Sequence, residues 1–323
     1  MNENIHLFGG DSERVTVIGE SAGGGSILHQ ITSYGGKGGQ LPFQQAILQS
    51  PGWYPLPTDE QHEASLQQFL GLLNVSTVEE ARKLPTAKLV AANAKQVYRS
   101  PYGTYTYGPA VDGTFVPKMP GELLLEGNFH KNLSLMVGHN SNEGLLFTPP
   151  TSINSNSYAS LLEADLPDIQ QNVTNYISNV LYPPVYNGTY GYTNPILRFA
   201  TTIADIVFQC NTDYLNRAFH NQTYAYLFSV PPGLHGSDLQ YTFYNPAANS
   251  TVTSKNVALA LQDYITSFAE TGAPRSSVGP AFEKHGKEQQ ILNLGVSNIT
   301  TIHDPTANPR CLFWQNAPYY QHS

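Results

Sequence analysis

A short apolar segment followed by a glycine-rich turn constrains the fold of this chain more than any other stretch. Residues 15–18 (Val-Thr-Val-Ile) form a β-branched run without polar alternation, which is typical of a strand buried on both faces of a parallel sheet. Residues 19–23 read Gly-Glu-Ser-Ala-Gly, and the apolar residues in 22–32 have the spacing of a helix. The sequence therefore predicts a strand, a sharp turn and a helix in succession.

The turn has the G-x-S-x-G pattern of a nucleophile elbow. Such a tight turn leaves no room for side chains two residues before and after the serine, so we expect glycine to be required at both Gly19 and Gly23. Ser21 would be held out from the backbone, with the N–H of Ala22 directed to where an oxyanion forms. A plain glycine-serine turn before a helix is the alternative interpretation, because the pattern also occurs by chance.

Composition limits the partners that the protein can have. Charged residues make up 12% of the 323 residues, the formal net charge is −8, and lysine and arginine form no cluster. These values give no support for a nucleic acid or an acidic membrane as partner, and a small or neutral ligand is expected instead. No apolar run has the length of a transmembrane helix, and residues 1–8 lack the regions of a signal peptide. The sequence leaves the oligomeric state open.

Other features of the sequence are typical of a secreted protein. Asn-x-Ser/Thr sequons are more frequent than the roughly four expected from the composition. These glycosylation candidates are Asn74, Asn132, Asn172, Asn187, Asn221, Asn249 and Asn298. The two cysteines, Cys210 and Cys311, permit one disulfide or two buried thiols. Because these secretory traits occur without an export signal, we expect that an N-terminal part of the protein precedes this chain.

The remaining pattern alternates strands and helices and predicts one α/β domain over residues 1–323, with a helical insertion at about 151–218. The glycine-rich stretch 33–42 lacks the spacing of a phosphate-binding loop and is interpreted as a surface loop. The aromatic stretch 98–107 could line a pocket, although plain packing is the favoured interpretation. Further strands are predicted at 43–49, 133–137 and 223–230, and helices at 59–73, 77–83, 86–97 and 254–270.

A serine hydroxyl is a poor nucleophile unless an imidazole accepts its proton and a carboxylate fixes that imidazole. Of the ten histidines, His235 directly follows the predicted strand 223–230, in a loop whose prolines and glycines can hold a side chain at the strand end. His220 precedes that strand and His29 lies on the helix after Ser21, so both are interpreted as structural. His235 is therefore the candidate base.

The acid is expected between the serine and the histidine in the chain, because α/β-hydrolases carry their triad in the order Ser, acid, His. Glu143 follows the third predicted strand and satisfies this order. Asp112 lies in a Val-Asp-Gly turn and Asp205 lies in a helical pattern, and these two carboxylates compete with Glu143.

Six stretches together resemble type-B carboxylesterases, the group that includes cholinesterases and fungal lipases, over essentially the full length. They read FGGDSERVTVIGESAGGGS (8–26), AILQSPG (46–52), GPAVDGTFVP (108–117), GHNSNEGLLF (138–147), GLHGSDLQYTF (233–243) and CLFWQNAP (311–318). The resemblance implies an α/β-hydrolase fold, a mostly parallel sheet with flanking helices, and hydrolysis of carboxylic esters without a metal or an organic cofactor. The family's nucleophile, acid and base correspond to Ser21, Glu143 and His235.

The same resemblance implies two structural roles. Glu20 corresponds to a buried acid of the family, with Ser50 and Asp238 at positions that join it in a hydrogen-bond network. A solvated carboxylate at the start of the helix is the alternative for Glu20. Cys210 and Cys311 correspond to a disulfide that ties the region before the histidine strand to the C-terminal helix.

One element of the family is missing. Its members usually begin with a further segment that carries the first strands of the sheet and a His-Gly-Gly loop with two oxyanion donors, whereas this chain starts just ahead of the strand 15–18. We therefore expect a C-terminal portion of a secreted esterase, truncated at its N-terminus, with an exposed apolar edge at that strand and little activity by itself. An inactive fragment and a non-catalytic, neuroligin-like binding module are the alternatives.

Overall fold

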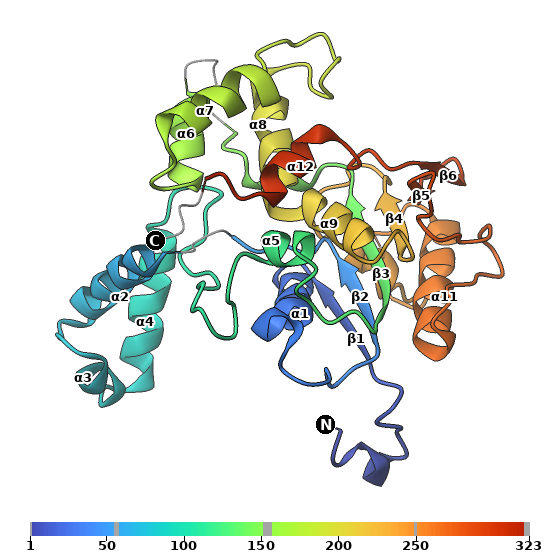
Figure 1. Cartoon of the computed structure of the whole chain (residues 1–323), viewed down its shortest axis with the longest axis horizontal. Helices are drawn as coiled ribbons and strands as arrows, with labels where there is room; N and C mark the ends of the chain where they lie inside the picture. The colour runs from blue at the N-terminus through green and yellow to red at the C-terminus, as the bar shows by residue number, and fades with distance from the viewer. Residues whose placement is uncertain (1, 55–57, 151–156, 249–250, 320–323) are drawn as a thin grey trace.

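The computed structural model describes residues 2–54, 58–150, 157–248 and 251–319, and its centre is a six-stranded sheet in the order β1-β2-β3-β4-β5-β6 (Figure 1). The first five strands pair in parallel and β6 pairs antiparallel with β5. Parallel pairing places the carboxyl ends of β1 to β5 along one edge of the sheet. The strands are β1 (Thr16–Glu20), β2 (Gln45–Gln49), β3 (Ser134–Asn140), β4 (Tyr224–Phe228), β5 (Gln290–Leu294) and β6 (Ile299–His303).

Helices connect and cover these strands (Figure 1). None of the described helices combines the length and the apolarity that crossing a bilayer requires. The α-helices are α1 (Ala22–Thr32), α2 (Asp59–Leu73), α3 (Val78–Arg82), α4 (Thr86–Tyr98), α5 (Pro120–Leu125), α6 (Tyr158–Asp165), α7 (Gln171–Tyr176), α8 (Pro195–Ala204), α9 (Cys210–Ala218), α10 (Leu239–Thr242), α11 (Lys255–Thr271) and α12 (Pro309–Gln315). The short helical turns are η1 (Ile5–Phe8), η2 (Ser33–Gly36), η3 (Glu143–Phe147) and the π-helical η4 (Ile177–Leu181) and η5 (Asp205–Gln209).

Successive side chains of the central strands point into two different cores. Leu48 and Val137 pack with α1, α9 and α12, whereas Ile47 and Met136 pack with α10 and α11. This alternation follows from the period of two in a strand, and it places α1 and α11 on opposite faces of the sheet (Figure 1). The predicted fold, a mostly parallel sheet with flanking helices, is therefore confirmed.

The first strand was expected to be buried by its apolar pattern and exposed by its place at the start of the sheet. Ile18 is 46% exposed, so burial of residues 15–18 on both faces is wrong, whereas the expected exposed apolar edge is found. The reason is position: β1 is the outermost strand, and within the described residues β2 is its only neighbour. An apolar strand thus occupies the edge of the sheet.

A largely helical stretch separates β3 from β4, in the region where the sequence analysis expected a helical insertion at about 151–218. Its expected start, residues 151–156, lies outside the described residues. From Tyr158 to Ala218 the chain runs through α6, α7, η4, α8, η5 and α9. The strands β5 and β6 and the helix α5 had no sequence prediction, because segments of five or six residues are too short to show a clear periodicity. Helices α2, α3 and α4 lie to one side, away from the sheet (Figure 1).

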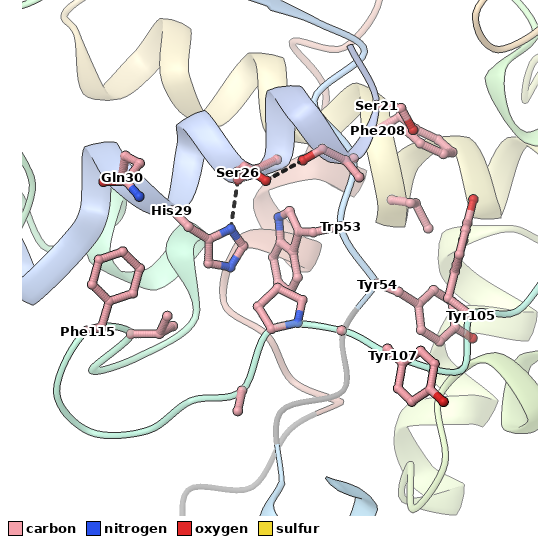
Figure 2. Close-up of a pocket in the computed structure, with 18 of the residues that line it drawn as sticks. Ser21, Ser26, His29, Gln30, Trp53, Tyr54, Tyr105, Tyr107, Phe115 and Phe208 are labelled. Atoms are coloured by element: carbon pink, nitrogen blue, oxygen red, sulfur yellow. Dashed lines mark hydrogen bonds between the residues drawn. The ribbon is translucent and has the colours of Figure 1, made fainter. Parts of the chain in front are cut away.

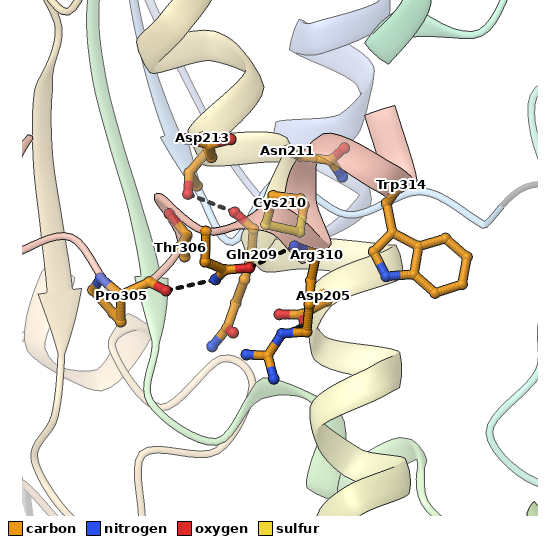
Figure 3. The surroundings of a disulfide bond; sticks show 12 residues. Asp205, Gln209, Cys210, Asn211, Asp213, Pro305, Thr306, Arg310 and Trp314 are labelled. Atoms are coloured by element: carbon orange, nitrogen blue, oxygen red, sulfur yellow. Dashed lines mark hydrogen bonds and ion pairs between the residues drawn. A yellow bond between two sulfur atoms is a disulfide. The ribbon is translucent and has the colours of Figure 1, made fainter. Parts of the chain in front are cut away.

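A disulfide between Cys210 and Cys311 joins the start of α9 to α12 (Figure 3). Both residues are fully buried, and 101 positions separate them in the sequence. Beside the bond, Arg310 forms an ion pair of 2.9 Å with Asp205, which also accepts a hydrogen bond of 2.7 Å from the Tyr182 hydroxyl. The C-terminal helix is therefore fixed to the body of the protein by a covalent bond and a buried charge pair.

We expect the double substitution Cys210→Ala with Cys311→Ala to lower the free energy of unfolding by about 4 kcal/mol, because removing a cross-link over so long a loop gives the unfolded chain more entropy. Urea unfolding followed by circular dichroism measures the change. A double variant with native stability would contradict a stabilising role for this bond.

Candidate active site

The nucleophile elbow joins β1 to α1 at Ser21. Ser21 has a positive φ of 57°, which is uncommon for a residue other than glycine. Two backbone hydrogen bonds hold this conformation: the N–H of Ser21 donates to the Gln49 carbonyl at 3.0 Å, and the N–H of Gly52 donates to the Ser21 carbonyl at 2.9 Å. The sharp turn is thus anchored to the end of the neighbouring strand β2.

Glycine is required at only one of the two expected positions. A Cβ atom at Gly19 would lie 2.4 Å from the carbonyl carbon of Gly23, so no side chain fits there. A Cβ atom at Gly23 would meet nothing within 4 Å, and the expectation of a steric requirement at this position is wrong. The close approaches occur instead at Gly24 and Gly25, whose Cβ atoms would lie 2.8 Å from Pro51 and 2.1 Å from Gly52.

His235 connects the serine to a carboxylate. Its Nε2 lies 2.7 Å from Ser21 Oγ, and its Nδ1 lies 2.5 Å from Glu143 Oε2. Because the carboxylate only accepts, Nδ1 carries the hydrogen and Nε2 is free to accept from the serine hydroxyl. The structure therefore brings together the three residues that the sequence selected.

Glu143 is fixed by its own set of contacts. The carboxylate is fully buried, and its Oε1 accepts hydrogen bonds from Ser50 Oγ at 2.6 Å and from the Asn140 N–H at 2.5 Å. The following residue, Gly144, packs so closely on α8 that a Cβ atom there would lie 1.9 Å from the Ala200 carbonyl. These contacts leave Oε2 for His235.

The network expected around Glu20 is organised differently. Ser50 binds Glu143, and Asp238 accepts hydrogen bonds from Asn140 at 3.2 Å and from Tyr226 at 2.9 Å. Among the described residues, neither Ser50 nor Asp238 forms a hydrogen bond with Glu20, so the three are not joined in the expected network. The pairing of β2 with β3 explains this outcome. Ser50 follows the end of β2 and Asn140 is the last residue of β3, so the Asn140 side chain donates a hydrogen bond to Ser50 Oγ.

Glu20 lies beside His235. Its Oε1 is buried, lies 3.4 Å from His235 Nε2 and has no hydrogen-bond partner among the described residues. Burial raises the pKa of Glu20 to about 7. Burial also disfavours charge on His235, but the hydrogen bond and charge of Glu143, with a smaller contribution from Glu20, outweigh it and raise the pKa of this imidazole.

Two phenylalanines that the sequence did not indicate pack on the imidazole. The ring of Phe208, on the π-helical turn η5, lies with its centroid 4.1 Å from that of His235, and the Phe147 ring lies 5.3 Å away. Gly52 makes room for Phe208, because a Cβ atom at that glycine would lie 2.4 Å from the ring. Aromatic side chains thus restrict the position of the base and exclude water from it.

A pocket of about 490 Å³ opens beside Ser21, between α1 and the segment 105–116 (Figure 2). Tyr105 and Tyr107 belong to its wall, so part of the aromatic stretch for which plain packing was favoured lines a pocket instead. Trp53 and Tyr54 complete the aromatic lining near the serine.

The competing residues take no part in the hydrogen bonds of Ser21 and His235. Asp205 is paired with Arg310, and Asp112 Oδ1 accepts hydrogen bonds from its own turn, from the N–H groups of Thr114 at 2.8 Å and Val116 at 2.9 Å. His220 follows α9 in a left-handed conformation. The described residues bring one potential metal-binding set together, Asp205 with the two cysteines, but sulfurs joined in a disulfide do not act as thiolate ligands.

Comparison with known proteins identifies the family. The carboxylesterase family model matches residues 1–314, and this chain belongs to that family. It is 36% identical over 320 residues to carboxylesterase patB of Penicillium expansum, covering 99% of this chain and 57% of the relative. A secreted lipase of Arthroderma benhamiae is 28% identical over 77% of this chain and 47% of its own length.

A solved structure supports the fold. Aspergillus niger EstA superposes with a TM-score of 0.83 at 22% identity, over 98% of this chain and 67% of that one. The chain spans little more than half the length of the relatives that it matches in sequence. The resemblance drawn from the sequence motifs is confirmed.

A pair of glycine substitutions tests the geometry of the elbow. We expect Gly19→Ala to lower the free energy of unfolding by about 2 kcal/mol, because the backbone must move to admit the Cβ atom. We expect Gly23→Ala, on the exposed start of α1, to be neutral or stabilising by less than about 1 kcal/mol. Urea unfolding of both variants measures this, and an equal loss in the two would contradict the assignment.

Proposed function

We propose that the protein hydrolyses carboxylic esters, with Ser21 as the nucleophile, His235 as the general base and Glu143 as the carboxylate that orients the imidazole. The observation that carries this proposal is the continuous hydrogen-bond chain from Ser21 Oγ through His235 to Glu143, at 2.7 and 2.5 Å. Membership in the carboxylesterase family supports the same reaction class. The proposal concerns the activity of the whole protein, in which these three side chains act together.

The proposed reaction has two halves. In the first, Ser21 Oγ attacks the acyl carbon while its proton passes to His235 Nε2, and the oxyanion accepts a hydrogen bond from the Ala22 N–H at the start of α1. The imidazolium then gives its proton to the departing alcohol, and an acyl-enzyme remains on Ser21. In the second half, water attacks the acyl carbon, His235 takes its proton and returns it to Ser21, and the carboxylic acid leaves.

The surroundings of His235 suit this cycle. Glu143 accepts from Nδ1 throughout and stabilises the imidazolium that forms when Nε2 takes the proton. Phe208 and Phe147 keep the ring in one orientation. A non-catalytic binding module is not favoured, because such a module has no need of a connected serine, histidine and carboxylate.

We also propose that the protein is secreted and glycosylated. The support is a relative named as a secreted lipase and the exposure of the sequon asparagines. Asn74, Asn132, Asn172, Asn187 and Asn298 are exposed, Asn221 is half-buried, and Asn249 lies outside the described residues.

Hydrolysis of p-nitrophenyl butyrate tests the proposed nucleophile. We expect Ser21→Ala to reduce kcat by at least about 10³-fold, because no other group on this path can form the acyl-enzyme. Ser297→Ala, which changes an exposed serine in the turn between β5 and β6 and leaves every sequon intact, is the matched control and should keep the native rate. If both forms hydrolysed the ester above the uncatalysed rate and the Ser21→Ala variant kept the native rate, the proposal would be refuted, as it would by labelling of the variant with a fluorophosphonate probe.

The pH dependence tests the proposed base. Ester hydrolysis requires neutral His235, so kcat/KM should rise with pH, with a midpoint above the ordinary histidine value of 6.5 because the pKa of His235 is raised. Glu20→Gln removes a negative charge beside the imidazole, so the midpoint should move to lower pH. Glu13→Gln, at an exposed site, should leave it unchanged. A midpoint that moves upward in Glu20→Gln would contradict this account.

A further inference from the structure

The pocket beside Ser21 contains a histidine that the proposed reaction does not use. His29 lies on α1, is only 7% exposed and extends from the helix into the space between Trp53 and Phe115 (Figure 2). Its Nδ1 lies 2.8 Å from the Gly25 carbonyl oxygen. A carbonyl oxygen only accepts hydrogen bonds, so Nδ1 carries the hydrogen and Nε2 presents a lone pair.

The Nε2 atom of His29 is an unused acceptor. It makes no hydrogen bond to any residue that the structure describes, although the side chain is more than nine-tenths buried. Burial lowers the pKa of His29, so the imidazole stays neutral at physiological pH. Because His29 lines the pocket, Nε2 can accept a hydrogen bond from a ligand there, so this end of the pocket is complementary to a hydrogen-bond donor on a ligand.

The walls around His29 fit an uncharged ring. Trp53 packs edge-on against the imidazole with centroids 5.5 Å apart, and the pocket has no lysine or arginine among its described lining residues. Asp112 is its acidic member, and one oxygen of this carboxylate accepts from the N–H groups of its own turn. A hydroxyl group has a smaller desolvation cost than a charged group, and it supplies the hydrogen that His29 Nε2 can accept.

The helix sets the length of such a ligand. His29 lies eight positions after Ser21, which corresponds to about 12 Å of helix rise. Helical side chains lean toward the N-terminus, and the Nδ1 contact with Gly25 shows that His29 does so. A donor that reaches Nε2 therefore lies on the order of 8–12 Å from an ester carbonyl at Ser21.

We propose that this pocket binds esters that end in a neutral ring bearing a hydroxyl group, which donates its hydrogen to His29 Nε2. Esters of 3-(4-hydroxyphenyl)propanoic acid have this chemistry and about this length. The substrate class rests on the ester hydrolysis proposed above, but the binding interaction can be measured without turnover.

The test compares two ligands that differ in one group. Methyl 3-(4-hydroxyphenyl)propanoate and methyl 3-(4-methylphenyl)propanoate are titrated by ligand-observed NMR into the full chain carrying Ser21→Ala, which prevents hydrolysis. We expect the hydroxyl ligand to bind about 3- to 10-fold more tightly, as one hydrogen bond allows. Adding His29→Phe should reduce this ratio to about one, and adding His29→Gln, which retains an acceptor, should restore part of it.

Controls separate the possible failures. His6→Phe, at an exposed site far from the pocket, should leave the ratio unchanged, and circular dichroism checks that each variant is folded. Equal affinities for the two ligands, or a preference that persists in His29→Phe, would overturn the inference. The proposed reaction is judged separately by p-nitrophenyl butyrate hydrolysis in the chain with Ser21 intact, so the two proposals can fail independently.

Discussion

Parallel pairing of strands is the constraint on which the site depends. It brings the carboxyl ends of β1, β3 and β4 to one edge of the sheet, and Ser21, Glu143 and His235 each follow one of these ends. Residues that are far apart in the chain therefore meet without any long excursion of the backbone. The loops after the strands then bring the three side chains into contact.

Glu143 and Glu20 both lie beside the imidazole of His235, but their surroundings differ. Glu143 receives two hydrogen bonds on one oxygen and gives the other to Nδ1, so its orientation is fixed. Glu20 is beside Nε2 with no donor on its buried oxygen, which suits it to influence the imidazole through charge. One carboxylate thus orients the ring, while the other tunes its protonation.

Local patterns predicted the fold and the three central residues, because strand, elbow and helix at Ser21 are encoded within one short stretch. Contacts that depend on how distant segments pack together could not be predicted from the sequence. Gly24 and Gly25 pack against the segment after β2, and not against the turn itself. Phe208 packs on His235 from a π-helical turn, which no periodicity in the sequence predicts. Ser50 contacts Glu143 because of strand register, which sequence spacing does not specify.

The position of Phe208 has a consequence for how such a protein can diverge. The same ring forms part of the wall of the pocket and lies against the imidazole of His235. Under the proposed mechanism, a substitution that widens the pocket at this point also frees the imidazole of His235 to move, so the range of accepted esters and the turnover are expected to change together. Selectivity can change with less effect on the proposed reaction at the end of the pocket where Gln30 and Phe115 lie, away from Ser21 (Figure 2).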